Sequence, residues 1–134
     1  MHSDLDYLSS KFSCLNLDFI LNKLSSEYYE LPRWPENLAA QIIEFYRRFL
    51  WLNYIYPEAK LVPTRDIDEC WHIHILNTKR YVEDCQALFG RYFHHQPADP
   101  SDPLELIFLQ EKFEETRRLY RENFGEELKV FHSR

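Results

Sequence analysis

Glycine is nearly absent from this chain, and the two glycines that occur stand where helices would end. Gly90 and Gly125 each follow a phenylalanine at the end of a long stretch with apolar residues at helical spacing. Glycine adopts the left-handed conformation at a helix C-terminus without the steric cost that a β-carbon adds. Seven prolines mark further boundaries. Because no alternation typical of strands competes over a comparable length, this pattern predicts a helical protein.

The apolar spacing between these markers predicts four helical segments. They are Asp4 to Glu30 with a break near Asn16, Pro35 to Tyr56, Asp66 to Phe89, and Pro103 to Phe124. Pro35 and Pro103 would occupy first-turn positions, where the missing N–H costs nothing, and Asp102 would cap the last helix. We therefore expect an all-α fold, with residues 1–134 forming a single compact, bundle-like domain of four to five helices.

Charge, apolar stretches and cysteine content indicate which partners and which cellular compartment to expect. The net charge is -6, and the basic residues are scattered in short pairs, so we expect no nucleic-acid partner. The first residues lack the basic start and apolar core of a signal peptide, so we expect none, and the longest apolar stretch, Phe49 to Pro57, is too short to cross a membrane. Three cysteines without a CxxC pair favour a reducing compartment. These features predict a cytoplasmic protein without membrane contact.

Four of the six histidines fall between Trp71 and Gln96. If residues 66–89 form a regular helix, His72 and His74 point about 200° apart and cannot bind one ion together. His74 lies on the apolar face, where the simplest interpretation is a core histidine bonded to a carbonyl or a tyrosine. Trp71 and Cys85 share that face and would be structural.

His72 and the loop after Gly90 are the accessible parts of this segment. Asp68 precedes His72 by one helical turn and could orient its imidazole, as carboxylates do around metals and in general-base catalysis. His94 and His95 follow on the loop, and imidazole suits zinc, iron, copper or nickel. The spacing matches no zinc template such as HExxH or paired CxxC.

Helix length limits how these histidines could meet. About 26 Å of regular helix would separate His72 from Phe89, and a loop of a few residues cannot cover that distance. Convergence of His94 or His95 with His72 or His74 therefore requires a break in the helix near Asn77, or partners from another helix or subunit. Asn77 is followed by a threonine, which gives a weak helix-breaking signal.

The segment from Val62 to Leu76, VPTRDIDECWHIHIL, resembles the core of the glycine-rich domain-containing protein-like family. The resemblance continues through Tyr81, Cys85, Gly90 and the His-His-Gln-Pro run that ends at Pro97, and it defines a signature segment, residues 63–97. It implies no reaction, because the family is largely uncharacterised. The resemblance does not extend to the glycine-rich tail of plant members, so it implies no RNA-binding role.

Two hypotheses remain open from the sequence. In the first, a histidine-centred site binds a transition metal, zinc or iron, in a protein that could be a metal-dependent enzyme. Its ligands would be drawn from four histidines, with an aspartate and a tyrosine supporting them: His72, His74, His94, His95, Asp68 and Tyr81. In the second, the Trp-His-x-His segment is structural, and an aromatic surface meets a protein partner. The oligomeric state is not predicted.

Overall fold

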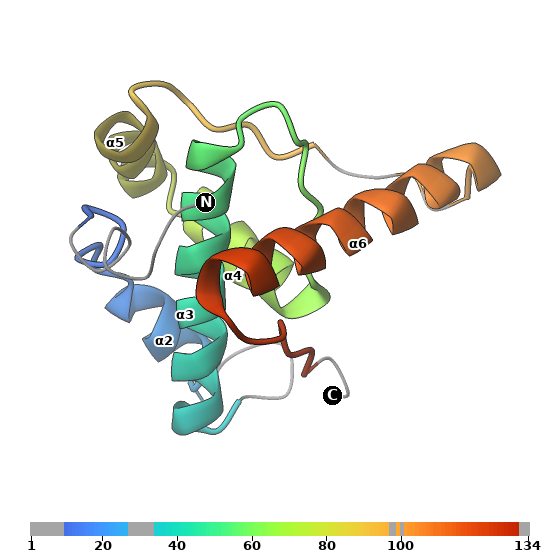
Figure 1. The fold of residues 1–134 in the computed structure, drawn as a ribbon. Helices are drawn as coiled ribbons and strands as arrows, with labels where there is room; N and C mark the ends of the chain where they lie inside the picture. Colours follow the sequence, from blue (N-terminus) through green and yellow to red (C-terminus); the bar gives the residue numbers. More distant parts are fainter. Residues whose placement is uncertain (1–9, 27–33, 97–98, 100, 132–134) are drawn as a thin grey trace.

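The chain folds into helices that agree with the expected boundaries in most places. The computed structural model describes residues 10–26, 34–96, 99 and 101–131. Its helices are α2 (Asp18–Leu24), α3 (Glu36–Ile55), α4 (Arg65–Leu76), α5 (Thr78–Phe89) and α6 (Pro103–Phe124), shown in Figure 1. No strand occurs among the described residues. The prediction of an all-α fold is confirmed.

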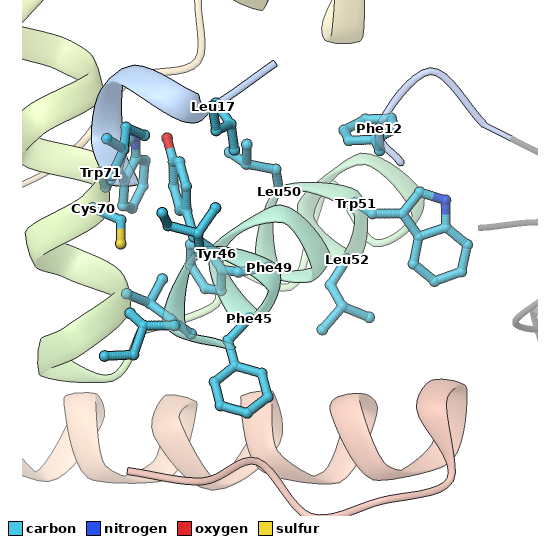
Figure 2. Packing of buried hydrophobic residues seen from close by; sticks show 14 of the residues in the cluster. Phe12, Leu17, Phe45, Tyr46, Phe49, Leu50, Trp51, Leu52, Cys70 and Trp71 are labelled. Atoms are coloured by element: carbon cyan, nitrogen blue, oxygen red, sulfur yellow. The ribbon is translucent and has the colours of Figure 1, made fainter. Parts of the chain in front are cut away.

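Helix α3 provides the centre of the core. It packs against α2, α4 and α6, and nine of its twenty residues are buried. Figure 2 shows Phe45 directed toward α6, whereas Tyr46 lies between α3 and α4, near Trp71. Aromatic rings fill much of this core; Phe49 contacts the Trp71 ring edge-on at a centroid distance of 5.5 Å. Aromatic contacts thus join α3 to α4 and, through Phe45 and Tyr120, to α6.

The ends of the helices follow the sequence signals. Gly90 and Gly125 close α5 and α6 in the left-handed conformation, with φ of 72° and 71°. Asp102 caps α6 by accepting hydrogen bonds from the backbone N–H groups of Leu104 and Glu105. The predicted C-terminal glycines and the predicted aspartate cap are therefore confirmed.

The N-terminal helix is shorter than predicted. Among the described residues of this region, the helix covers only Asp18–Leu24, and much of the expected range from Asp4 to Glu30 lies outside the described residues. The predicted break near Asn16 is present. The Asn16 side chain accepts a hydrogen bond from the Asp18 backbone N–H. Such a local side-chain bond competes with helix continuation, which explains why the helix starts after this residue.

The prediction of one continuous helix from Asp66 to Phe89 is wrong. Asn77, with φ of -86° and ψ of 73°, interrupts it and separates α4 from α5. The Asn77 N–H still bonds to His74 O, and its carbonyl accepts from the Tyr81 N–H, so the break leaves these backbone groups satisfied. The consequence is a change of direction between the two halves of the signature segment.

Cys14, Cys70 and Cys85 are free thiols, which agrees with the absence of a CxxC pair. Within the described part of the chain, no helix combines the length and apolar character that crossing a membrane requires.

Candidate functional site

The site begins on the first turns of α4. The Thr64 hydroxyl accepts a hydrogen bond from the Ile67 N–H and fixes the start of the helix. Asp68 and His72 then lie one turn apart on the outer face. His72 Nε2 is 3.4 Å from Asp68 Oδ2, and the His72 side chain is 57% exposed. The predicted pairing of these two residues is therefore present in the structure.

The second half of the signature segment brings a loop back over α4. Because the chain turns at Asn77, α5 ends at Gly90 in a position from which residues 91–96 can return. Tyr81 holds this loop: its hydroxyl accepts from Trp71 Nε1 at 2.9 Å and donates to the carbonyl of Phe93 at 2.5 Å. The Phe93 ring also stacks on Trp71, with centroids 5.0 Å apart and an angle of 13°.

This loop places His95 beside the residues of α4. His95 Nε2 lies 2.5 Å from Asp68 Oδ1, and its ring centroid is 4.3 Å from that of Trp71 and 4.8 Å from that of His72. One ligand atom from each of Asp68, His72 and His95 lies within 4.8 Å of the other two. We call these three residues the His-Asp cluster.

The chemistry of the His-Asp cluster is that of two imidazoles sharing one carboxylate. Oδ1 of Asp68 faces the His95 ring and Oδ2 faces the His72 ring, so each oxygen can accept a hydrogen bond from a different imidazole. Two histidines and one carboxylate are also a ligand set found around zinc and non-haem iron. His95 is mostly covered and Asp68 partly covered, with exposed fractions of 16% and 33%, whereas His72 opens to solvent.

His74 occupies a different position, inside the core. Its side chain is 1% exposed, Nδ1 is 2.8 Å from the Tyr46 hydroxyl, and Nε2 is 2.7 Å from Asp84 Oδ2. Burial lowers the pKa of His74, although the hydrogen bond to Asp84 opposes this shift. Both ring nitrogens are occupied, so His74 serves the core as the simplest interpretation of the sequence expected.

A tyrosine partner of His74 was expected, but neither its position nor the partner Asp84 was anticipated from the sequence. Tyr46 comes from α3 and Asp84 from α5, so the three residues meet only through tertiary packing. In a continuous helix, only residues three or four positions apart are neighbours, so helix geometry gave no reason to pair His74 with Asp84, ten positions later. The sequence indicated a buried histidine, and such a residue needs hydrogen-bond partners. This signal does not identify which residues those partners are.

The other predicted residues divide between the loop and the core. His94 is exposed and contacts the Tyr92 ring at a centroid distance of 4.7 Å, outside the His-Asp cluster. Trp71 and Cys85 are buried. Burial raises the pKa of the Cys85 thiol and, more strongly, that of the Tyr81 phenol, so both groups keep their protons at neutral pH. Tyr81 therefore acts as a hydrogen-bond donor to the loop.

A family model matches a part of the chain that includes the signature segment. The model of the UCP032817-like family matches residues 15–120, which include α2 to α5, the whole His-Asp cluster and most of α6. The chain belongs to the UCP032817-like family. The match extends well beyond the signature segment and covers most of the helices that surround the cluster.

Curated relatives support the resemblance found in the sequence. Glycine-rich domain-containing protein 1 of Arabidopsis thaliana is 30% identical over 135 residues, covering 91% of this chain and 16% of that protein. Glycine-rich domain-containing protein 2 of the same plant is 28% identical over 127 residues, covering 88% and 16%. The chain thus spans about a sixth of the length of these relatives. No solved structure matches it significantly.

Proposed function

We propose that the His-Asp cluster binds one divalent transition metal ion, zinc or iron(II), through His72, His95 and Asp68. The observation that carries this proposal is the approach of three ligand atoms from two separate elements to within 4.8 Å of one another. Two ligands of a tetrahedral zinc ion lie about 3.4 Å apart, given bond lengths near 2.1 Å. The ligand atoms would need only small side-chain movements to reach that arrangement.

The surroundings of the cluster support binding at this place. Trp71 packs against the His95 ring, and Tyr81 fixes the loop that carries it, so His95 is held in place before an ion arrives. Preorganised ligands bind more tightly, because less side-chain freedom is lost on binding. The ligands would come from a helix and an anchored loop rather than from a freely moving segment.

A metal held by three protein ligands would keep coordination positions for water or substrate. Catalytic zinc sites and iron sites with two histidines and one carboxylate share this property, whereas structural zinc sites are closed by four protein ligands. His72 stands on the solvent side of the cluster, which leaves a route for a small molecule. The proposal is therefore an open metal site, compatible with a metal-dependent enzyme whose reaction is not assigned.

Calorimetric titration of tag-free, chelator-treated protein tests the proposal. We expect about one Zn²⁺ per chain, and about one Fe²⁺ under anaerobic conditions, with affinity falling at least tenfold in His72→Ala, His95→Ala and Asp68→Asn. His94→Ala is the matched control, because it removes a neighbouring exposed imidazole outside the cluster. Equal affinity in wild type, His72→Ala and His95→Ala would refute the proposal.

A further inference from the structure

Helix α6 has two halves with different surroundings. All of its buried residues fall in the last nine positions: Thr116, Leu119, Tyr120, Asn123 and Phe124. The first half, residues 103–112, contains no buried residue and projects beyond the other helices, as the orange end of α6 in Figure 1 shows. The thirteen residues before Thr116 correspond to about 20 Å of helix. We call residues 103–112 the overhang, because no side chain in this part of α6 is buried against the other helices.

The overhang carries a concentration of exposed apolar side chains. Leu104, Leu106, Ile107 and Phe108 are 79%, 41%, 53% and 46% exposed. The other large apolar side chains exposed among the described residues are separated along the sequence, which is normal for a protein surface. Four exposed apolar side chains within five positions of one helix are different, because clustered apolar surface marks interaction sites.

These side chains surround the helix rather than forming one stripe. At about 100° per residue, Leu104, Ile107 and Phe108 share a face, while Leu106 points away from it. A helix that is apolar on most of its circumference is normally buried. Residues 103–112 therefore carry large apolar side chains among polar ones on a segment of helix that the rest of the fold leaves uncovered.

The local sequence also fixes this half as a helix. Pro103 fills the first position, Asp102 caps it, and the Glu105 side chain accepts a hydrogen bond from the Asp99 N–H. These interactions start the helix thirteen positions before its first buried residue, Thr116. The apolar residues are thus presented on a defined surface.

Charge indicates the chemistry of what covers this surface. From Asp99 to Glu115 the sequence has six carboxylates and a single cation, Lys112. Glu114 and Glu115 pair with arginines of the next turn. The remaining four have no ion pair within the described part of the chain: Asp99, Asp102, Glu105 and Glu111. Asp99, Asp102 and Glu105 accept local hydrogen bonds, but no cation among the described residues offsets their charge, so the apolar surface is bordered by net negative charge. Such a surface is complementary to an apolar segment bordered by lysine or arginine.

We propose that residues 103–112 of α6 dock an amphipathic protein segment with an apolar face flanked by basic residues. A second copy of the chain fits less well, because it would bring the same carboxylates against these and adds to a net charge of -6. An anionic membrane surface is disfavoured for the same reason. This surface is separate from the His-Asp cluster, and the proposal does not depend on metal binding.

The probe is a pair of synthetic helical peptides that carry the same stripe of leucines. Lysines flank the stripe in one peptide, and glutamates flank it in the other. Fluorescence anisotropy at physiological salt should show the lysine peptide binding at least tenfold more tightly than the glutamate peptide. A double variant, Ile107→Ser with Phe108→Ser, should weaken binding at least tenfold, and Glu111→Lys should weaken it several-fold. Leu76→Ser is the matched control, because Leu76 is an 81% exposed leucine on α4.

The outcomes distinguish the occupants. Equal binding of both peptides, absence of binding, or binding unchanged in the double variant would overturn the proposal. Concentration-dependent dimerisation that the double variant abolishes, measured by sedimentation, would assign the surface to a second copy instead. Binding to vesicles of neutral or anionic lipid that the double variant abolishes would assign it to a membrane. Circular dichroism confirms that each variant keeps its helices.

Discussion

Nε2 of His95 lies 2.5 Å from Oδ1 of Asp68, although 27 positions separate the two residues. This contact joins the loop after α5 to the first turns of α4, and it depends on the change of direction at Asn77. The loop is anchored on its inner side by Tyr81 and Trp71. The functional proposal and the packing of the signature segment are therefore linked through the same few residues.

Removing the Tyr81 hydroxyl should weaken both the fold and the site. In Tyr81→Phe, the Trp71 indole N–H loses its acceptor and the Phe93 carbonyl loses its donor, which should cost about 1–3 kcal/mol of unfolding free energy. The loop would also be less restrained, so zinc affinity should fall while one ion per chain still binds. Urea unfolding and calorimetric titration measure the two effects. Unchanged zinc affinity would show that the loop anchor does not position His95.

The two histidines of the Trp-His-x-His segment should differ in their effect on stability. His74→Ala leaves the Tyr46 hydroxyl and Asp84 without their shared partner in the core, at a cost of about 2–4 kcal/mol. His72→Ala removes an exposed side chain and should change the metal-free stability by less than about 0.5 kcal/mol. Urea denaturation of both variants without metal checks this. Equal midpoints would contradict the placement of His74 in the core.

The two glycines allow a matched comparison. An added β-carbon would meet no atom within 4 Å at either Gly90 or Gly125, so alanine should cost only the strain of a positive φ. That strain is about 1 kcal/mol at each site. Both variants should lower stability to a similar extent, but only Gly90→Ala, which lies next to the loop carrying His95, should reduce zinc affinity. A larger affinity loss in Gly125→Ala would be incompatible with the proposed site.

Alkaline pH should reveal the buried tyrosines. Burial is the largest cause that raises the pKa of Tyr120 from 10.0 to about 12, and the Arg48 guanidinium opposes it. Because the folded pKa exceeds the unfolded one, this stabilising contribution is complete below pH 10 and is lost as the pH rises toward 12. The unfolding free energy of Tyr120→Phe should therefore fall less steeply across this window than that of wild type. Identical slopes in chemical denaturation would argue against a buried phenol.

Local signals in the sequence were sufficient for most of the fold. Gly90, Gly125 and Asp102 act through their own backbone or the next turn, so their roles can be inferred from spacing alone. Asn77 gave only a weak signal, because asparagine is tolerated inside helices and its helix propensity is similar to that of Thr78 beside it. A continuous helix was therefore expected. A break near Asn77 was considered only because the histidines of the helix and the loop could not otherwise meet within one chain.

The site was only partly predictable for a related reason. Asp68 and His72 are one turn apart, so their pairing follows from helix geometry. The choice of His95 rather than His94 depends on how the loop packs on Trp71, which no spacing rule describes. The same holds for Asp84, whose contact with His74 arises after the helix has broken. Tertiary packing supplies this information, and sequence periodicity does not.

NMR of the histidine ring nitrogens during zinc addition tests the central claim most directly, because it identifies the imidazoles that bind. With ¹⁵N-labelled, tag-free protein, we predict that the ring nitrogen signals of His72 and His95 shift together and saturate at about one Zn²⁺ per chain. The signals of His74 and His94 should stay in place. Shifts confined to His94, or the absence of any saturable shift at His72 and His95, would contradict a metal site at the His-Asp cluster.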